Sequence, residues 1–177
     1  FNSFDLPVKI IRPFNNFGPR QSERAIIPTI ISQLLNNKSK RLNLGNITPT
    51  RDFTYVKDTC HAYLEIFKNN NFVGNITNVG TNKEISVGQL ASKISKIMNV
   101  ETSIFEETKR LRPINSEVER LVCDNSKILK MSKWRYSLFI HENIDTSLVF
   151  YPFSGPDFLH AYYLYPNASE YILLALE

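Results

Sequence analysis

The amino-acid sequence predicts an α/β fold, and two observations support this prediction. Short β-branched runs alternate along the chain with segments that repeat apolar residues at helical spacing, without any internal repeat. The composition of the 177 residues, 42% hydrophobic and 21% charged, is typical of a globular protein. A chain of this length is able to bury a sizeable core.

Local patterns predict the elements of the first half. Residues 8–11 are a β-branched run that ends at an Arg-Pro pair, which favours a buried strand. Residues 14–22 contain Asn-Asn and Gly-Pro, which favour a loop. Helical spacing of apolar residues predicts a helix over 25–35, with Pro28 in the first turn, where a missing N–H matters least. Residues 42–44 are a second expected strand.

Glycines and capping residues mark the elements that follow. Ser86 is suited to cap the N-terminus of one helix, and Asp124 that of another. The expected elements are, in chain order, a helix over 55–67, a strand within 74–80, a helix over 87–98, a strand over 102–105 and a helix that ends at Met131. The apolar stripe of the first of these helices consists of Val56, Ala62, Tyr63, Ile66 and Phe67.

Charge is distributed unevenly along the chain. Residues 1–135 hold all 21 basic and 12 acidic residues, a net charge of +9, whereas residues 136–177 hold five acidic residues and no basic ones. The same tail carries ten of the 21 aromatic residues. The asymmetry predicts two regions, 1–138 and an unrelated or fused tail over 139–177. One domain with an acidic, aromatic end is the alternative. Within the tail we expect strands over 148–150 and 171–176 and a helix over 156–163.

Several protein classes are set aside by the composition. No apolar run approaches the roughly 20 residues needed to span a bilayer, and no secretory signal is recognisable. The two cysteines, Cys60 and Cys123, are too few for a disulfide framework, so we expect reduced thiols and a cytoplasmic protein. The three histidines are isolated and do not predict a metal site.

The sequence holds no complete catalytic constellation. It has no G-x-S-x-G, P-loop or H-E-x-x-H motif, and its six glycines are too far apart for a dinucleotide-binding fingerprint. No tyrosine is followed four residues later by lysine. The sequence therefore predicts no catalytic residue in this chain.

Arginines follow the expected strands instead. Arg12, Arg20, Arg51 and Arg112 all lie in or beside loops. The planar guanidinium group suits phosphate oxygens, and α/β sheets bind ligands at loops that follow strands. Two or three of these side chains would hold a diphosphate. The alternative is that they are solvated or ion-paired surface arginines. Nucleic acid is the less favoured anion, because the basic residues are scattered and not arranged in a stripe.

Four segments resemble a known family. Residues 6–21, L-P-V-K-I-I-R-P-F-N-N-F-G-P-R-Q, resemble the R-x-F-N-x-(Y/F)-G-P-R segment of extended short-chain dehydrogenases/reductases, and more narrowly of NAD-dependent nucleotide-sugar 4,6-dehydratases and epimerases. Residues 50–58, 78–90 and 110–127 resemble the family's R-D-(F/Y/W)-x-(Y/H)-V-x-D, N-(V/I)-G…S-(V/I)-x-(E/D)-L and R-x-R-P-x-x-S-E-V…D-x-S-K segments, in the family's order. The resemblance implies a Rossmann-like fold with a substrate-binding subdomain, of which this chain is the C-terminal part with an incomplete sheet.

The resemblance also implies roles for single residues. Asn15 would hydrogen-bond the diphosphate or the sugar of the substrate, and Arg51 and Arg112 would bind the diphosphate. Pro13 and Phe14 would lie near the nicotinamide ring of NAD.

Other positions have less direct implied roles. Arg20, with Ile27 and Pro28, would line the nucleotide site. Asp52 has a structural role in this motif more often than a ligand contact.

The implied function is the substrate-binding portion of a nucleotide-sugar 4,6-dehydratase acting on a substrate of the UDP-N-acetylglucosamine type or a related sugar. The alternatives are part of a 4-epimerase and a non-catalytic nucleotide-sugar binding module. In the family, the glycine-rich NAD loop and the Tyr-x-x-x-Lys pair lie upstream of the segment at 6–21, and the whole enzyme is a homodimer. Residues 134–138 are similar to the family's closing W-x-P-x-Y-S-L without its proline, and 151–159 resemble a bacterial family of unknown function.

Overall fold

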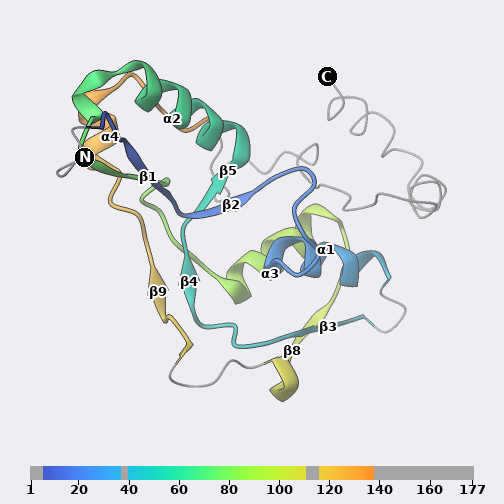
Figure 1. The fold of residues 1–177 in the computed structure, drawn as a ribbon. Helices are drawn as coiled ribbons and strands as arrows, with labels where there is room; N and C mark the ends of the chain where they lie inside the picture. Colours follow the sequence, from blue (N-terminus) through green and yellow to red (C-terminus); the bar gives the residue numbers. More distant parts are fainter. Residues whose placement is uncertain (1–5, 37–39, 111–115, 138–177) are drawn as a thin grey trace. The chain divides into compact units, whose positions relative to one another are not determined.

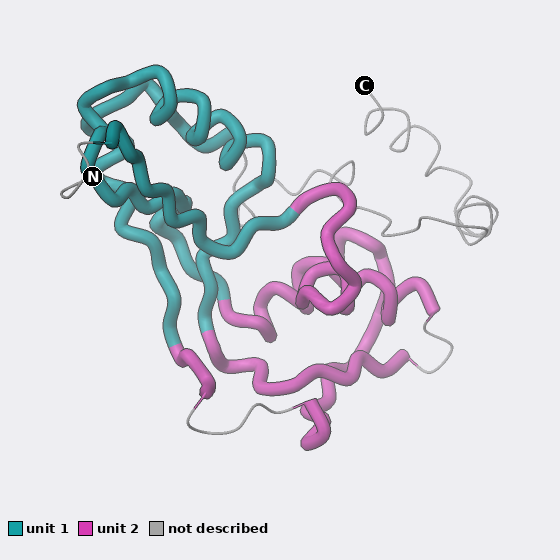
Figure 2. The backbone as a smooth tube through the Cα atoms, viewed as in Figure 1, with its two compact units in different colours: residues 1–17, 50–85, 120–143 teal, residues 18–49, 86–119, 144–177 magenta. Residues whose placement is uncertain are grey.

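The computed structural model describes residues 6–36, 40–110 and 116–137, and these form an α/β fold, as the sequence predicts (Figure 1). The elements expected in the tail and the boundary at residue 138 lie outside the described residues. The chain divides into two compact units, which are described separately (Figure 2). Unit 1 comprises residues 1–17, 50–85 and 120–143, and unit 2 comprises residues 18–49, 86–119 and 144–177.

Short, mostly parallel strand pairings form the framework of unit 1. β1 (Ile10–Pro13) pairs with β6 (Ile76–Val79) in parallel. β2 (Asn15–Phe17) pairs in parallel with β5 (Phe53–Tyr55). The third group has the strand order β7 (Ile85–Ser86), β4 (Thr50–Arg51), β9 (Arg120–Leu121), and β4 is parallel to β9.

Helices cover one face of the β1–β6 pair in unit 1. They are α2 (Val56–Lys68), the single turn η1 (Asn70–Phe72) and α4 (Ser126–Met131). Their shared core consists of Ala62, Ile66, Phe72, Val79, Ile128 and Trp134. The indole Nε1 of Trp134 donates a hydrogen bond of 2.8 Å to the carbonyl oxygen of Asp58, and Ser137 donates to the Asp58 carboxylate from both its N–H and its hydroxyl. The segment 120–137 is therefore packed into unit 1 as far as Ser137.

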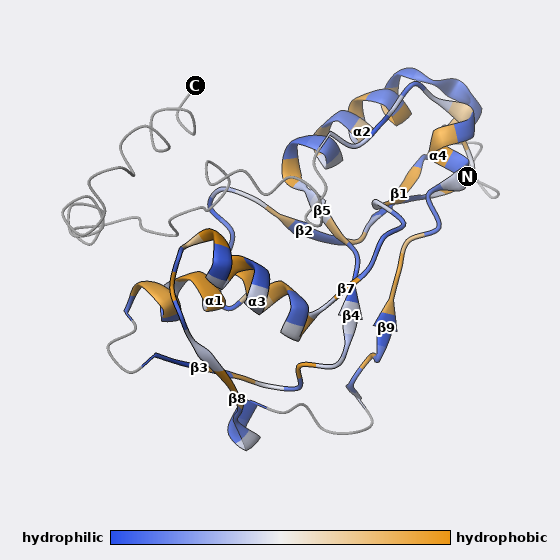
Figure 3. Ribbon diagram, turned by 180° about the vertical axis from the view of Figure 1, so that it is seen from behind, coloured by the Kyte–Doolittle hydropathy of each residue, from blue (hydrophilic) through white to orange (hydrophobic). Residues whose placement is uncertain are grey.

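Unit 2 packs two helices with one parallel strand pair. Helix α1 (Ile26–Leu35) contacts α3 (Val87–Ile97), and β3 (Arg41–Leu44) pairs with β8 (Ser103–Glu106). The short turn η2 (Thr108–Arg110) follows β8. In Figure 3 most of the α1 ribbon has the colour of hydrophobic residues, in keeping with its five buried residues.

Helix α3 begins where its capping residues predict. The Ser86 hydroxyl accepts the Gln89 N–H, and the Gln89 side chain accepts the Ser86 N–H, which completes a capping box. The cap defines the first turn by local interactions alone. The buried face of the helix is formed by Leu90, Ala91, Ile94 and Ser95.

Most of the expected elements are confirmed, with four corrections. The strand expected to be buried over 8–11 is β1, and three of its four residues are exposed, because among the described strands it pairs only with β6. The expected loop over 14–22 contains β2, because tertiary pairing with β5 extends a segment that has turn-forming residues. Tyr63 and Phe67 were expected in the apolar stripe of α2 but are 45% and 77% exposed. Asp124 accepts a hydrogen bond from the Ser126 N–H, but the cap position itself is taken by Asn125.

Candidate functional site

Arg51 lies at the end of β4, where the sequence predicts a diphosphate ligand. The pairing of β4 with β9 places Thr50 opposite Arg120 and Arg51 opposite Leu121. The Arg51 side chain is half-buried, and its Nη1 donates a hydrogen bond of 2.8 Å to the carbonyl oxygen of Thr50. This bond limits the directions in which the guanidinium group extends.

Asp52, the next residue, is buried and anchors the chain directly after Arg51. Its Oδ1 accepts hydrogen bonds from the Thr81 N–H (2.9 Å) and hydroxyl (2.6 Å). Its Oδ2 accepts the N–H groups of Asn82 (2.8 Å) and Cys123 (3.1 Å). The side chain is 0% exposed, so these four donors replace water for a buried carboxylate. The contacts fit the structural role that the family resemblance implies.

Gly80 and Cys123 close this cluster. A Cβ added at Gly80 would lie 2.3 Å from the Cys123 Cβ and 3.0 Å from the Asp52 carboxylate, so only glycine fits. The Asn125 side chain donates a hydrogen bond of 2.8 Å to the Gly80 carbonyl oxygen. Burial, followed by the negative charges of Asp52 and Asp124, raises the pKa of the Cys123 thiol to about 12.

We expect the two cysteines to differ in reactivity towards iodoacetamide. A pH of 8 lies far below the pKa of the buried Cys123 thiol, so this residue carries little reactive thiolate. Cys60, in contrast, is exposed. Mass spectrometry of the native chain after brief treatment should find one modified residue, Cys60. Both should react in urea. Equal labelling of the two residues in the native chain would contradict the placement of Cys123.

Asn15 lies on β2, which pairs with the strand that follows Arg51 and Asp52. The parallel pairing of β2 with β5 places Asn15 opposite Phe53, two residues after Arg51. The adjacent Asn16 accepts a hydrogen bond of 2.6 Å from the Thr59 hydroxyl on α2. Because consecutive strand residues point to opposite faces, Asn15 points away from α2. Asn15 and Arg51 thus lie on neighbouring segments of unit 1.

Pro13 and Phe14 connect β1 to β2. The Phe14 N–H donates a hydrogen bond of 2.9 Å to the carbonyl oxygen of Val79, which continues the pairing of β1 with β6 by one residue. Pro13 is exposed and Phe14 is half-buried. Both therefore lie at the carboxyl end of a parallel strand, where α/β sheets place their ligands.

The remaining predicted residues belong to unit 2 or lie outside the described residues. Arg20 belongs to unit 2, is exposed and has a φ of 63°, in a turn closed by the hydrogen bond from the Gln21 N–H to the Gly18 carbonyl oxygen. Ile27 and Pro28 are buried in the apolar face of α1, also in unit 2. Arg112 lies outside the described residues.

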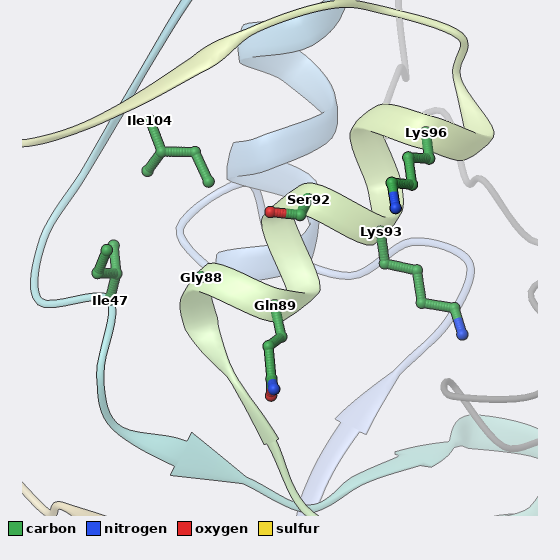
Figure 4. Close-up of a pocket in the computed structure, with 7 residues that line it drawn as sticks. All are labelled: Ile47, Gly88, Gln89, Ser92, Lys93, Lys96 and Ile104. Atoms are coloured by element: carbon green, nitrogen blue, oxygen red, sulfur yellow. The ribbon is translucent and has the colours of Figure 1, made fainter.

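A groove of about 640 Å³ lies on unit 2 along α3 (Figure 4). Gln89, Ser92, Lys93 and Lys96 line it from the helix, with Gly88, Ile47 and Ile104. Among the described residues, none of those predicted from the sequence lines it. Over the ranges 6–36, 40–110 and 116–137, no three His, Cys, Asp or Glu side chains are grouped so as to hold a metal ion. No helix within the same part of the chain has the length and apolar character that crossing a membrane requires.

Local sequence patterns do not reveal the residues that surround the Arg51 segment. Glu84 contacts Thr50 and Arg120, although these partners lie 34 and 36 residues away in the sequence. A single sequence carries no local signal for such contacts, because each residue alone is an ordinary surface polar residue. The motif at 50–58 pointed to Arg51 and Asp52 but not to their partners.

Comparison with known proteins assigns the family. Residues 1–146 match the family model described as GDP-mannose 4,6 dehydratase. A dTDP-D-glucose 4,6-dehydratase of Dictyostelium discoideum is 40% identical over 97 residues, which are 55% of this chain and 22% of that protein. A GDP-6-deoxy-D-mannose reductase of Pseudomonas aeruginosa is 27% identical over 141 residues, 77% of this chain and 45% of that protein.

Solved structures share the fold. A UDP-glucuronic acid 4-epimerase from Bacillus cereus, solved with UDP-glucuronic acid and NAD, matches with a TM-score of 0.70 and 24% identity, over 84% of this chain and 44% of that one. The chain spans less than half the length of each of these three relatives. The resemblance seen in the four sequence motifs is confirmed: the chain belongs to the GDP-mannose 4,6 dehydratase family.

Proposed function

We propose that this chain is the substrate-binding portion of an NAD-dependent nucleotide-sugar 4,6-dehydratase. Family membership and the identity to a dTDP-D-glucose 4,6-dehydratase support the proposal. The observation that carries it is the arrangement in unit 1, where Asn15 lies opposite Phe53 of β5, two residues after Arg51, and the buried Asp52 anchors the chain between Arg51 and Phe53. Such support fixes the direction of a side chain that must meet a ligand.

The chemistry of the two side chains suits a sugar diphosphate. The fork of N–H donors on Arg51 matches two phosphate oxygens, and charge-assisted hydrogen bonds of this kind are the stronger ones in proteins. The Asn15 amide donates and accepts, so it serves either a phosphate oxygen or a sugar hydroxyl. Arg20 and Arg112 are the further proposed ligands of the same substrate.

NAD is the proposed cofactor, and it supplies reversible hydride transfer at the sugar. Pro13 and Phe14 suit contact with a flat cofactor ring. The exposed proline ring and the half-buried phenyl ring offer an apolar surface at the carboxyl end of β1. Their proposed part is to contact the nicotinamide ring. The resemblance assigns the binding of the cofactor's phosphates to a segment upstream of these residues.

The uncovered side of β1 favours the hypothesis that the chain is part of an enzyme over the hypothesis that it is a complete binding module. Among the described strands, β1 pairs only with β6, and Ile10 and Ile76 on this pair are 46% and 41% exposed. Parallel sheets are normally covered on both faces, and an open strand edge promotes association between chains. We propose that a further part of the enzyme covers this surface. The full enzyme would be a homodimer that acts in the cytoplasm.

A calorimetric titration tests the function. The purified chain is titrated with dTDP-glucose, UDP-N-acetylglucosamine and GDP-mannose in turn, and each mixture is checked for product. We expect one of these sugars to bind with a Kd in the range of about 1 μM to 1 mM, as for ordinary enzyme substrates, without turnover. Absence of binding to all three would overturn the proposal.

Two further readouts separate the alternatives. Turnover by the isolated chain would contradict a role limited to substrate binding. Light scattering over a range of concentrations should show association through the open edge of β1. If the chain stays monomeric and its affinity for UDP equals its affinity for the sugar nucleotides, the non-catalytic module is favoured instead.

A further inference from the structure

The groove along α3 is part of a longer depression on unit 2. Figure 4 shows the groove itself, and a second hollow of about 410 Å³ adjoins it. The two hollows share Ser92, Lys96 and Ile104, so they run together along the helix. Because α3 has 11 residues and rises 1.5 Å per residue, the depression extends over about 16 Å.

Hydrogen bonds of the chain itself hold the walls of this groove in place. The Ile47 carbonyl oxygen accepts a hydrogen bond of 2.9 Å from the Gly88 N–H. The Ile47 N–H donates to the Glu106 carboxylate at 3.1 Å. Ile104 belongs to β8, where it lies opposite Leu42 of β3. The groove therefore exists before a ligand binds, as ligand sites usually do.

The groove combines an apolar wall with positive charge. Two half-buried isoleucines form the wall opposite the helix, and Lys93 and Lys96 line the groove from α3 (Figure 4). Glu101 is the acidic residue among the described lining residues, and its carboxylate pairs with Lys40 at 3.8 Å. Such a surface suits a ligand that carries both apolar groups and negative charge.

The C-terminal part of this chain, outside the described residues, has the matching composition. Residues 136–177 carry five acidic residues, no basic ones and ten of the 21 aromatic residues. Within them, residues 150–158, F-Y-P-F-S-G-P-D-F, hold four aromatic residues and one carboxylate, Asp157. An extended chain rises about 3.3 Å per residue, so the step from Phe153 to Phe158 spans about 16 Å, the length of the groove.

We propose that residues 150–158 of this chain dock in the groove along α3, with aromatic rings against its apolar wall and the Asp157 carboxylate beside Lys93 and Lys96. The covalent connection makes this an intramolecular encounter, which raises the effective concentration of the segment. The twelve residues between Ser137 and residue 150 span up to about 40 Å when extended. This inference goes beyond the proposed function and does not depend on it.

A second exposed apolar surface is less suited to the same segment. Tyr63, Leu64 and Phe67 lie exposed on α2 in unit 1. Lys9 lies 5.8 Å from the centre of the Phe67 ring and directly precedes β1, so this surface borders the strand that we propose a further part of the enzyme covers. The outer side of a helix contacts an aromatic ring on one side, whereas a groove contacts it on two.

Carbodiimide cross-linking of the full chain tests the docking. Residues 136–177 hold no lysine, so every amide bond that their carboxylates form joins them to an amino group elsewhere. We expect mass spectrometry of the monomer fraction to find Asp157 joined to Lys93 or Lys96. Cross-links to the exposed lysines of α2 should be much rarer.

A charge-reversed double variant of the full chain provides a second readout. Lys93→Glu with Lys96→Glu should speed hydrogen exchange in the peptide over 150–158 by about tenfold, because two attractive contacts become repulsive. Lys57→Glu with Lys68→Glu is the matched control. It makes the same change in net charge at two exposed positions of α2, so exchange in 150–158 should stay as in wild type.

A third variant separates charge pairing from damage to the groove. Asp157→Lys, added to the Lys93→Glu and Lys96→Glu variant, restores opposite charges and should slow exchange in 150–158 again. Failure of this rescue would overturn the proposal. So would exchange in wild-type 150–158 at the rate of an unstructured peptide, or cross-links spread evenly over the lysines. Cross-links confined to dimers, or exchange that responds to the α2 control instead, would equally overturn docking of the segment in the groove of its own chain.

Discussion

Asp52→Asn is expected to destabilise the chain by about 2–4 kcal/mol, the largest effect on stability of any single substitution considered for unit 1. The carboxylate accepts four hydrogen bonds, two at each oxygen, in a position with no exposure to water. An amide nitrogen at either position donates and does not accept, so two donors would be left buried and unsatisfied. Urea unfolding, followed by tryptophan fluorescence of Trp134, measures the change.

Two further variants make this prediction specific. Asp124→Asn removes the charge of an exposed aspartate that accepts hydrogen bonds from the Ser126 N–H and hydroxyl, so it should change the unfolding midpoint much less. If Asp52→Asn does not yield folded protein, Thr81→Ala removes one of the four hydrogen bonds and should give a smaller, measurable loss. An unfolding midpoint for both Asp52→Asn and Thr81→Ala equal to that of wild type would contradict the role of this cluster.

Arg51→Ala is expected to weaken nucleotide-sugar binding by a factor of about 10 to 100. This corresponds to about 1.5–3 kcal/mol, the usual range for hydrogen bonds to charged groups. Arg51→Lys keeps the charge but not the fork of donors, so it should retain only part of the affinity. The measurement is a calorimetric titration of each variant, with the thermal midpoint as a check that the fold is kept.

An exposed arginine of unit 2 serves as the control for Arg51. Arg24→Ala removes one positive charge from the same chain, so it has the same effect on net charge as Arg51→Ala. It should leave the Kd near the wild-type value. An equal loss of affinity in the two variants would mean that overall charge, and not a particular side chain, attracts the ligand. An unchanged Kd in Arg51→Ala would mean that Arg51 does not bind the ligand and is an ordinary surface arginine.

Local signals account for the parts of the fold that the sequence predicted. The helix over 87–98 was predicted from Ser86, and the capping box that forms there involves residues three positions apart. The strand within 74–80 was predicted from the glycines that close it and is β6. Both are marked by local residues, which a single sequence displays, although β6 forms its backbone pairing with the distant β1.

Tertiary pairing accounts for the parts that were missed. β4 and β9 are two residues long and become strands through tertiary pairing, with each other across 70 residues and, for β4, also with β7. The exposed Tyr63 and Phe67 have the spacing of a buried stripe, but spacing does not reveal whether a packing partner is present. Short strands and partner surfaces are therefore beyond what local patterns predict.

The candidate site was predictable to a similar extent. Arg51 and Asn15 were found because they follow strands and because their motifs resemble a family, and unit 1 places them on neighbouring segments. The support provided by Asp52 and Glu84 depends on partners that lie about 30 to 70 residues away, at Thr81, Cys123 and Arg120. Such hydrogen bonds form only when folding brings these distant residues together, so local sequence patterns do not predict them.

Hydrogen exchange followed by mass spectrometry is the most direct test of the central claim, that unit 1 binds a nucleotide sugar through Asn15 and Arg51. The chain is compared with and without saturating dTDP-glucose, or whichever of the three nucleotide sugars binds. We expect slower exchange in peptides that cover residues 12–17 and 50–55, and the same protection to be lost in Arg51→Ala. Binding that protects neither segment, or only segments along α3 in unit 2, would contradict the account.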